Sequence, residues 1–341
     1  MTGAFMSESG DLQPDDVRII RSLQVAPRAS FAAIADVLGL TENAVGRRYR
    51  RMRADGVVRV AGIVDPGALG QGRWLVRLRC RPGSVATIAD ALARRDDVSW
   101  ISLGAAGSEI TCAVRSRTRE QRDDLLGRRL PRTAAVLDIH ASALLRQFVG
   151  GRGHYWAALS GTLTPEQEAA LGNEGGPFTE APVVAREPVR LAPEDEKLLD
   201  VLAGDGRASL VDLGAASGLT PGRVSRRLHA LLAHRVVHID VEIAAAALGY
   251  HARANLWLRV HPSAVKSVGR TLAKMPEIAF AAAVSGPHNL HAVAHCRDLD
   301  ELFEFTTDRI GSLPGLESME VSPVLRHVKQ AGTLLSGDRL A

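Results

Sequence analysis

Cysteines and aromatic residues are scarce in this sequence, and long apolar runs and catalytic motifs are missing from it. The three cysteines lie far apart and form no CxxC pair, so we expect neither a zinc ribbon nor a disulfide framework. No stretch approaches the roughly 20 apolar residues of a membrane span. The first ten residues do not resemble a signal peptide. We therefore expect a cytoplasmic protein that has no contact with a membrane and needs no metal or other cofactor.

What the sequence does contain is an internal repeat. Residues 12–60 align without a gap on residues 191–239 at an offset of 179, and Arg28-Ala29-Ser30 falls on Arg207-Ala208-Ser209. The part that follows repeats at an offset of 180, so that Pro82 falls on Pro262. A fixed offset of this kind indicates a duplicated unit. The expected divisions are a disordered N-terminus (1–11), helix-turn-helix domains at 12–64 and 191–243, α/β domains at 72–148 and 252–330, a linker (149–190) and a C-terminal tail (331–341).

The first part of each unit has the pattern of a helix-turn-helix domain. In the first copy, Pro14 begins a helix, Ser30 caps a second, Gly39 supplies the turn, and Thr41 caps a third helix that runs to about Asp55. Two short helices joined by a glycine-containing turn are typical of this motif. The alternative is a solvated basic helix in an unrelated bundle. The repetition of turn glycine and cap in both copies argues against it.

The third helix of the first copy has two distinct faces. Val45, Tyr49 and Met52 share one stripe, which we expect to be buried, whereas Asn43 and Arg47 lie roughly opposite, with Gly46 leaving room beside them. Arginine reads guanine and asparagine reads adenine, while flanking arginines suit phosphates. The predicted DNA contacts are Thr41, Asn43, Arg47, Arg48, Arg50, Arg51 and Arg53 in the first copy, and Thr220, Arg223, Arg226, Arg227 and His229 in the second.

The two copies differ in charge. Residues 14–60 contain nine arginines and five acidic residues, a net charge of +4, whereas residues 193–239 contain six basic and six acidic residues. Because affinity for DNA rises with the number of phosphates neutralised, we expect the first copy to dominate binding.

The second part of each unit has the element order βαββαβ, which is the ferredoxin-like arrangement. The fold class is therefore α+β, with two winged-helix-like helix-turn-helix domains and two ferredoxin-like domains in tandem. One face of each sheet is covered by its own helices, and the other needs another cover. On the third strands, Ile110 and Leu290 suit the helix side, whereas Thr111 and His291 suit the open side. We expect the two α/β domains of one chain to pack sheet to sheet as a pseudo-dimer.

This order of elements resembles the Lrp/AsnC (feast/famine) regulators, in a fused form of double length. The resemblance implies a sequence-specific DNA-binding transcription regulator, not an enzyme, whose partners are double-stranded DNA, a small effector such as an amino acid, and further copies of the pseudo-dimeric chain. It also implies an effector loop of the form G-x-x-D between the second and third strands of the ferredoxin-like (RAM) domain. The residues at this loop are Gly286, Pro287, His288 and Asn289 in the second copy, and Gly107, Ser108 and Glu109 in the first. The departures from the pattern leave the effector open, and an ordinary β-turn without a ligand is the alternative.

A tetrapyrrole enzyme is the second hypothesis, because siroheme decarboxylases share this architecture. His288, His291 and His295 are the residues that favour it, since imidazole is a common metal ligand. However, His291 and His295 are four residues apart on a predicted strand, which separates their Cα atoms by about 13 Å. Histidines with a structural or interface role are therefore the preferred interpretation.

Overall fold

The computed structural model describes residues 12–116, 119–150, 156–172 and 187–340. The N-terminus that the sequence predicts to be disordered, residues 1–11, lies outside the described residues. Within the described residues, no helix is both long and apolar enough to cross a membrane.

The first helix-turn-helix domain contains α1 (Pro14–Val25), α2 (Phe31–Leu38) and α3 (Glu42–Ala54). Its predicted caps are confirmed: the Ser30 hydroxyl accepts a hydrogen bond from the Ala33 amide, and the Thr41 hydroxyl accepts one from the Ala44 amide. Gly39 has φ +69°, a left-handed conformation that costs glycine little, so the chain turns sharply between α2 and α3.

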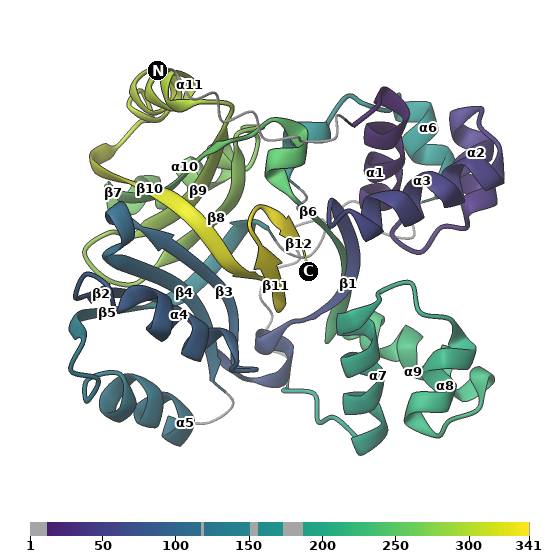
Figure 1. Ribbon diagram of the computed structural model, residues 1–341, viewed down its shortest axis with the longest axis horizontal. Helices are drawn as coiled ribbons and strands as arrows, with labels where there is room; N and C mark the ends of the chain where they lie inside the picture. The colour runs from purple at the N-terminus through teal and green to yellow at the C-terminus, as the bar shows by residue number, and fades with distance from the viewer. Residues whose placement is uncertain (1–11, 117–118, 151–155, 173–186, 341) are drawn as a thin grey trace.

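The second helix-turn-helix domain repeats this plan with α7 (Pro193–Gly204), α8 (Leu210–Ser217) and α9 (Pro221–Ala233). Each domain continues into one strand, β1 (Val58–Val64) or β6 (Val237–Ile243). These strands pair with each other as an antiparallel ribbon, in which Val58 lies opposite Ile243. The ribbon runs between the two helical domains at the right of Figure 1, so they are joined through backbone hydrogen bonds.

Both ferredoxin-like domains have the predicted βαββαβ order. The first comprises β2 (Gly72–Cys80), α4 (Val85–Ala93), β3 (Val98–Gly104), β4 (Glu109–Ser116), α5 (Arg119–Asp124) with a π-helical turn η3 (Leu125–Arg129), and β5 (Val136–Val149). The second comprises β7 (Ala252–Val260), α10 (Val265–Leu272), β8 (Ile278–Val284), β9 (Leu290–Cys296), α11 (Leu299–Glu304) with a π-helical turn η8 (Phe305–Ile310), and β10 (Leu316–Gln330). The α+β fold class is thus confirmed.

The two domains join by their strand edges as well as facing one another, which corrects the expectation of sheet-to-sheet packing alone. β5 pairs with β2 and then with β8 of the other copy, while β10 pairs with β7 and then with β3. These pairings close eight strands into a barrel, in the order β10-β3-β4-β2-β5-β8-β9-β7 and back to β10. The reason is physical: exposed strand edges leave backbone groups unpaired, and closure removes the edges.

The side chains of the barrel divide between its two surfaces as the strand alternation predicts. Ile110 and Leu290 are fully buried outside the barrel, in the clusters that include residues of the covering helices. Leu75, Trp257 and Val284 form a separate buried cluster that contains strands of both copies. The barrel lumen is therefore a core shared by the two halves of the chain.

Segments without a counterpart in the other copy pack against the first helix-turn-helix domain. In the linker, α6 (Pro165–Ala170) begins at the predicted cap Thr164, and nearby Leu159 and Leu163 join the core of that domain. The described part of the expected C-terminal tail is instead a hairpin of β11 (Thr333–Ser336) and β12 (Arg339–Leu340), because a tight turn at Ala331 and Gly332 folds it back on β10. The short helical turns are η1 (Pro66–Leu69), η2 (Ala105–Gly107), η4 (Ala157–Leu159), η6 (Ala245–Leu248) and η7 (Pro262–Ala264).

Candidate DNA interface and effector sites

Helix α3 has the two faces expected of a recognition helix. Val45, Tyr49 and Met52 are buried, whereas Asn43 and Arg47 are exposed on the opposite face, together with Arg50 at the next turn. Gly46 is buried, and a Cβ at this position would lie 3.3 Å from Arg50 Nη1 and 3.4 Å from the Phe31 ring. The glycine therefore leaves room for the Arg50 guanidinium, as expected, and it also allows α2 to pack closely on α3.

The arginines that flank this face are engaged with carboxylates. Asp16 is fully buried, and its two oxygens lie 3.0 Å from an Arg48 nitrogen and 2.5 Å from an Arg51 nitrogen. Arg53 reaches across to the second helix-turn-helix domain, where it pairs with Asp205 at 2.8 Å. These three side chains hold α3 in place, and their predicted contacts with phosphate stay predictions. Within the described residues, Arg47 and Arg50 have no carboxylate partner.

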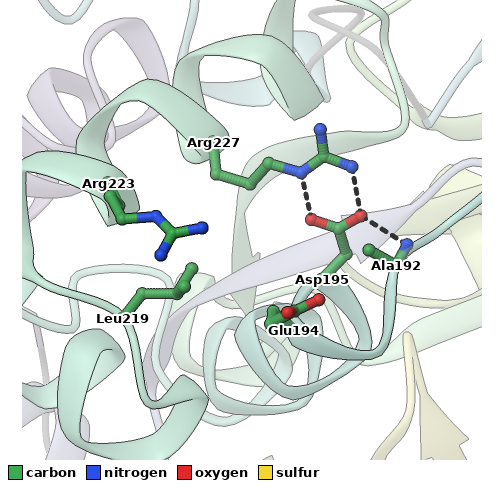
Figure 2. A pocket seen from close by; sticks show the side chains of 6 residues that line it. All are labelled: Ala192, Glu194, Asp195, Leu219, Arg223 and Arg227. Atoms are coloured by element: carbon green, nitrogen blue, oxygen red, sulfur yellow. Dashed lines mark hydrogen bonds and ion pairs between the residues drawn. The ribbon is translucent and has the colours of Figure 1, made fainter.

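The second copy reproduces the α1–α3 ion pair but not the basic face. Arg227 forms a two-pronged ion pair with buried Asp195, the counterparts of Arg48 and Asp16. Burial alone would raise the pKa of Asp195, but the hydrogen bonds from Arg227 and the Ala192 amide lower it. Figure 2 shows this pair in a pocket lined by Ala192, Glu194, Asp195, Leu219, Arg223 and Arg227, with the Arg223 side chain lying apart from the pair.

The remaining predicted contacts of the second copy are on the surface. Thr220, Arg223, Arg226 and His229 are all exposed along α9. Gly222 stands where α3 has Asn43, and the exposed Leu232 stands where α3 has Arg53. The reading face of α9 therefore offers fewer hydrogen-bond donors and acceptors than that of α3.

A reciprocal arginine contact, which sequence reasoning missed, locks the two helix-turn-helix domains together. Arg207 donates to the carbonyl oxygens of Pro27 and Ala29, at 2.6 and 2.7 Å. Its counterpart Arg28 donates to the carbonyl of Ala208 at 2.9 Å and to that of Gly206. The signal was present in the sequence, since Arg-Ala-Ser recurs at the same place in both copies. The contact fixes the orientation of the two helix-turn-helix domains relative to each other.

In the predicted effector loop of the second copy, the polar side chain of Asn289 is already hydrogen-bonded to the protein backbone. The Asn289 side chain accepts a hydrogen bond from the Val260 amide at 2.9 Å and donates one to the Val260 carbonyl at 2.6 Å. Gly286 has φ +113°, and a Cβ there would lie 3.3 Å from both His140 Nε2 and Ser142 Oγ of the first copy. The loop thus lies between the two halves of the chain. His288 lies beside Trp257, with 6.4 Å between the ring centres.

The equivalent loop of the first copy has different chemistry. Gly107 has φ +81°, and the Ser108 hydroxyl donates to the Ala105 carbonyl at 2.8 Å. Glu109, at the position of Asn289, is buried and lies 2.5 Å from Arg77 Nε. Arg77 also binds Glu320, and these partners raise its pKa. Ion-paired groups occupy this end of the barrel, so the two loops are not equivalent sites.

The three histidines of the second hypothesis are not brought together as one ligand set. His291 is buried, lies 3.1 Å from Asn255 Oδ1, and stacks near Trp257 with ring centres 4.4 Å apart. Burial, with a smaller effect of Arg77, lowers its pKa to about 3. His295 instead lies 4.9 Å from the ring centre of Trp156 in the linker. No group of three potential metal-binding His, Cys, Asp or Glu residues occurs in the described part of the chain.

Comparison with known proteins decides the family. Residues 14–53 and 195–232 match the AsnC-type helix-turn-helix domain, and residues 253–334 match the Lrp/AsnC ligand binding domain. The HTH-type transcriptional regulator FL11 of Pyrococcus horikoshii is 30% identical over 145 residues, which are 41% of this chain and 93% of that protein. The chain belongs to the Lrp/AsnC family. It is an Lrp/AsnC-type helix-turn-helix transcription regulator of double length.

Two further proteins are similar to this Lrp/AsnC chain, one in sequence and one in fold. The HTH-type transcriptional regulator Ptr1 of Methanocaldococcus jannaschii is 26% identical over 141 residues, covering 41% of this chain and 95% of that protein. The crystal structure of the siroheme decarboxylase NirDL superposes with a TM-score of 0.63 at 14% identity and covers 93% of both chains. At this identity the likeness shows only that the double-length fold is shared.

Proposed function

We propose that this Lrp/AsnC regulator reads a specific DNA sequence through α3, with α9 adding mainly contacts to the DNA backbone. The observation that carries the proposal is the exposed face of Asn43, Arg47 and Arg50 on a helix whose other arginines are tied to acids. A guanidinium without an internal partner keeps its donors for base edges and phosphates. The reciprocal Arg28 and Arg207 contact supports binding of one duplex by both domains.

We further propose that a small effector such as an amino acid modulates this binding at the barrel. The second loop supports this part, because Gly286 lies against Ser142 of the other copy and a ligand there would contact both halves. The side chains of Asn289, Glu109 and Ser108 are bound to protein partners, so we propose that an effector at the second loop contacts His288. Further copies of the chain are the other proposed partner, since two-fold assemblies suit palindromic operators.

The competing proposal is a tetrapyrrole enzyme on the same fold, which the superposition on NirDL and the buried histidines of the barrel favour. We favour a regulator without enzymatic activity, because a tetrapyrrole enzyme does not need the exposed basic face of α3 to bind or convert its substrate. Adding iron uroporphyrin to the purified protein tests this choice. A stoichiometric shift in the absorption spectrum, with no binding to DNA, would replace the regulator by the enzyme.

The direct test is genomic footprinting followed by gel shifts on the bound sites. Arg47→Ala and Arg50→Ala should weaken binding to the operator, while Arg128→Ala, which removes the same charge from an exposed site on the first ferredoxin-like domain, should not. If all three variants lost the same affinity, the arginines would contribute only general electrostatic attraction to DNA, and α3 would not be the sequence-reading helix. No footprint at any site would contradict the proposal itself.

A further inference from the structure

The C-terminal hairpin connects the barrel to the recognition helix of the first copy. The Leu340 amide donates to the Gly56 carbonyl at 2.9 Å, and Arg339 donates to the Asp55 carbonyl at 2.7 Å. Asp55 is the C-cap of α3. Gly56 has φ +65°, and a Cβ there would lie 2.4 Å from the Leu340 carbonyl oxygen. The hairpin therefore fits against the end of α3 at a place where only glycine is accommodated (Figure 1).

Within the hairpin, Asp338 is bound to the end of the barrel. One of its carboxylate oxygens accepts a hydrogen bond from Arg253 Nη2 at 2.5 Å. Arg253, on β7, is 8% exposed, whereas the Asp338 side chain is 54% exposed. Arg253 Nε, which lies beside Nη2 in the planar guanidinium, has no hydrogen-bond partner among the described residues. Arg253 thus binds this carboxylate through only one of the two nitrogens that form a carboxylate fork.

Two imidazoles lie next to this guanidinium with unused nitrogens. His295 on β9 is directly opposite Arg253 in the strand register, and His327 on β10 lies close enough to interact electrostatically with both side chains. The Nδ1 atoms of both histidines are buried and lack partners within the described ranges. Burial lowers the pKa of both, to about 3 for His327, with smaller effects of the neighbouring cations, so both rings are neutral at pH 7. A neutral imidazole offers one N–H to an acceptor.

The first copy lacks this arrangement. Its counterparts are Arg73, Arg115 and Gln147, and there the Gln147 side chain oxygen accepts from Arg73 at 2.8 Å. In the first copy the arginine thus binds a neutral amide, whereas the equivalent arginine of the second copy binds an exposed carboxylate. In the described part of the linker, β5 is followed by the helical turn η4 and helix α6, whereas β10 is followed by the hairpin. The unused donors are therefore particular to the end of the barrel that carries the hairpin.

We propose that Arg253, His295 and His327 form a carboxylate-binding site that Asp338 occupies as an internal ligand, and that a small free carboxylate competes with Asp338 and releases the hairpin from α3. A free carboxylate can align with Nε and Nη2 together and accept from a histidine, which the tethered Asp338 does not do. The consequence for DNA binding rests on the function proposed above, whereas binding of the carboxylate does not. This site is separate from the Gly286 loop.

Acetate, compared with chloride at equal ionic strength, is the probe, and the full-length chain is the protein. Asp338→Asn removes the internal competitor at an exposed position and should bind acetate at least tenfold more tightly by calorimetry. Asp300→Asn, an exposed carboxylate on α11, is the matched control and should behave as wild type. In the wild type at pH 7, acetate should speed hydrogen exchange of the Leu340 amide and shift the imidazole NMR signals of His295 or His327.

Each outcome bears on a different part of the proposal. If acetate and chloride act alike on wild type and Asp338→Asn, the carboxylate site is refuted. If acetate binds but leaves exchange of the Leu340 amide unchanged, the release of the hairpin is refuted. Affinity for the footprinted operator is read last, and it should fall about fivefold in Asp338→Asn. A wild type that binds acetate, loosens its hairpin and binds no DNA would contradict the proposed function while leaving the site intact.

Discussion

A buried carboxyl group beneath the hairpin should make the stability of this protein fall as the pH rises. Glu242 lies on β6 opposite Arg59, and its Oε2 accepts a hydrogen bond from Thr333 of the hairpin at 2.9 Å. Its other oxygen has no hydrogen-bond partner among the described residues. Burial raises the pKa of Glu242 from about 4.5 to about 7, against the smaller opposing effects of Thr333 and Arg59.

The direction and size of the effect follow from linkage. Between pH 4.5 and 7 the folded state holds a proton on Glu242 that the unfolded state has released, so the free energy of unfolding falls as the pH rises through this window. Above pH 7 the loss is complete. A shift of this size corresponds to about 3 kcal/mol, an upper bound because the protein can relax around the charge. Glu242→Gln keeps an acceptor for Thr333 and has no proton to lose.

The assay is urea unfolding of the wild type and Glu242→Gln at pH 5, 6, 7 and 8. We expect the variant to unfold with nearly the same free energy as the wild type at pH 5 and to be more stable by about 2–3 kcal/mol at pH 8. Glu317→Gln, an exposed carboxylate that pairs with Arg259, is the control and should leave the pH dependence unchanged. Parallel curves for the wild type and Glu242→Gln would refute the reasoning.

Three further outcomes are expected. Arg47→Ala or Arg50→Ala should each weaken specific DNA binding by about 1–3 kcal/mol if the contact is bidentate to a base, as measured by gel shift. Arg226→Ala should cost less than Arg47→Ala in the same titration, and equal losses would contradict the asymmetry of the two reading faces. Residues 1–150 and 190–341, expressed together, should copurify as one complex because β5 and β10 each complete the other half's sheet. Two separate, stable homodimers would speak against the shared barrel.

The helical parts of the fold were predictable because their signals are local. A serine cap, a left-handed glycine and a stripe of apolar residues act within a few positions, so Ser30, Gly39 and Val45 could be assigned from the sequence. The alternation on β4 and β9 likewise separated Ile110 and Leu290 from the lumen. In each case the residue type is determined by the backbone conformation or the burial of that one position.

The closure of the barrel and the hairpin could not be predicted in the same way. Pairing between strand edges uses backbone groups that every residue has, so the β5–β8 and β10–β3 contacts leave no side-chain pattern. Length was the available signal: β5 and β10 have 14 and 15 residues, whereas their neighbours β2 and β7 have nine. At four and two residues, β11 and β12 are too short to show a period.

The reading face of α3 illustrates why a basic helix is a poor guide to individual contacts. The sequence places Arg47 on the reading face and predicts that the flanking Arg48 contacts phosphate, yet Arg48 lies 3.0 Å from buried Asp16 while Arg47 is exposed. The partner that distinguishes them is 32 residues away, on α1. Asp195 and Arg227 repeat the pair in the second copy, even though the exposed face of α9 carries fewer basic residues than that of α3. A contact kept in both copies while the charges around it differ serves the packing of the domain. DNA specificity should therefore be sought in the exposed residues of this face, which are Arg47, shared by both copies, and Asn43 and Arg50, which the second copy replaces by Gly222 and His229.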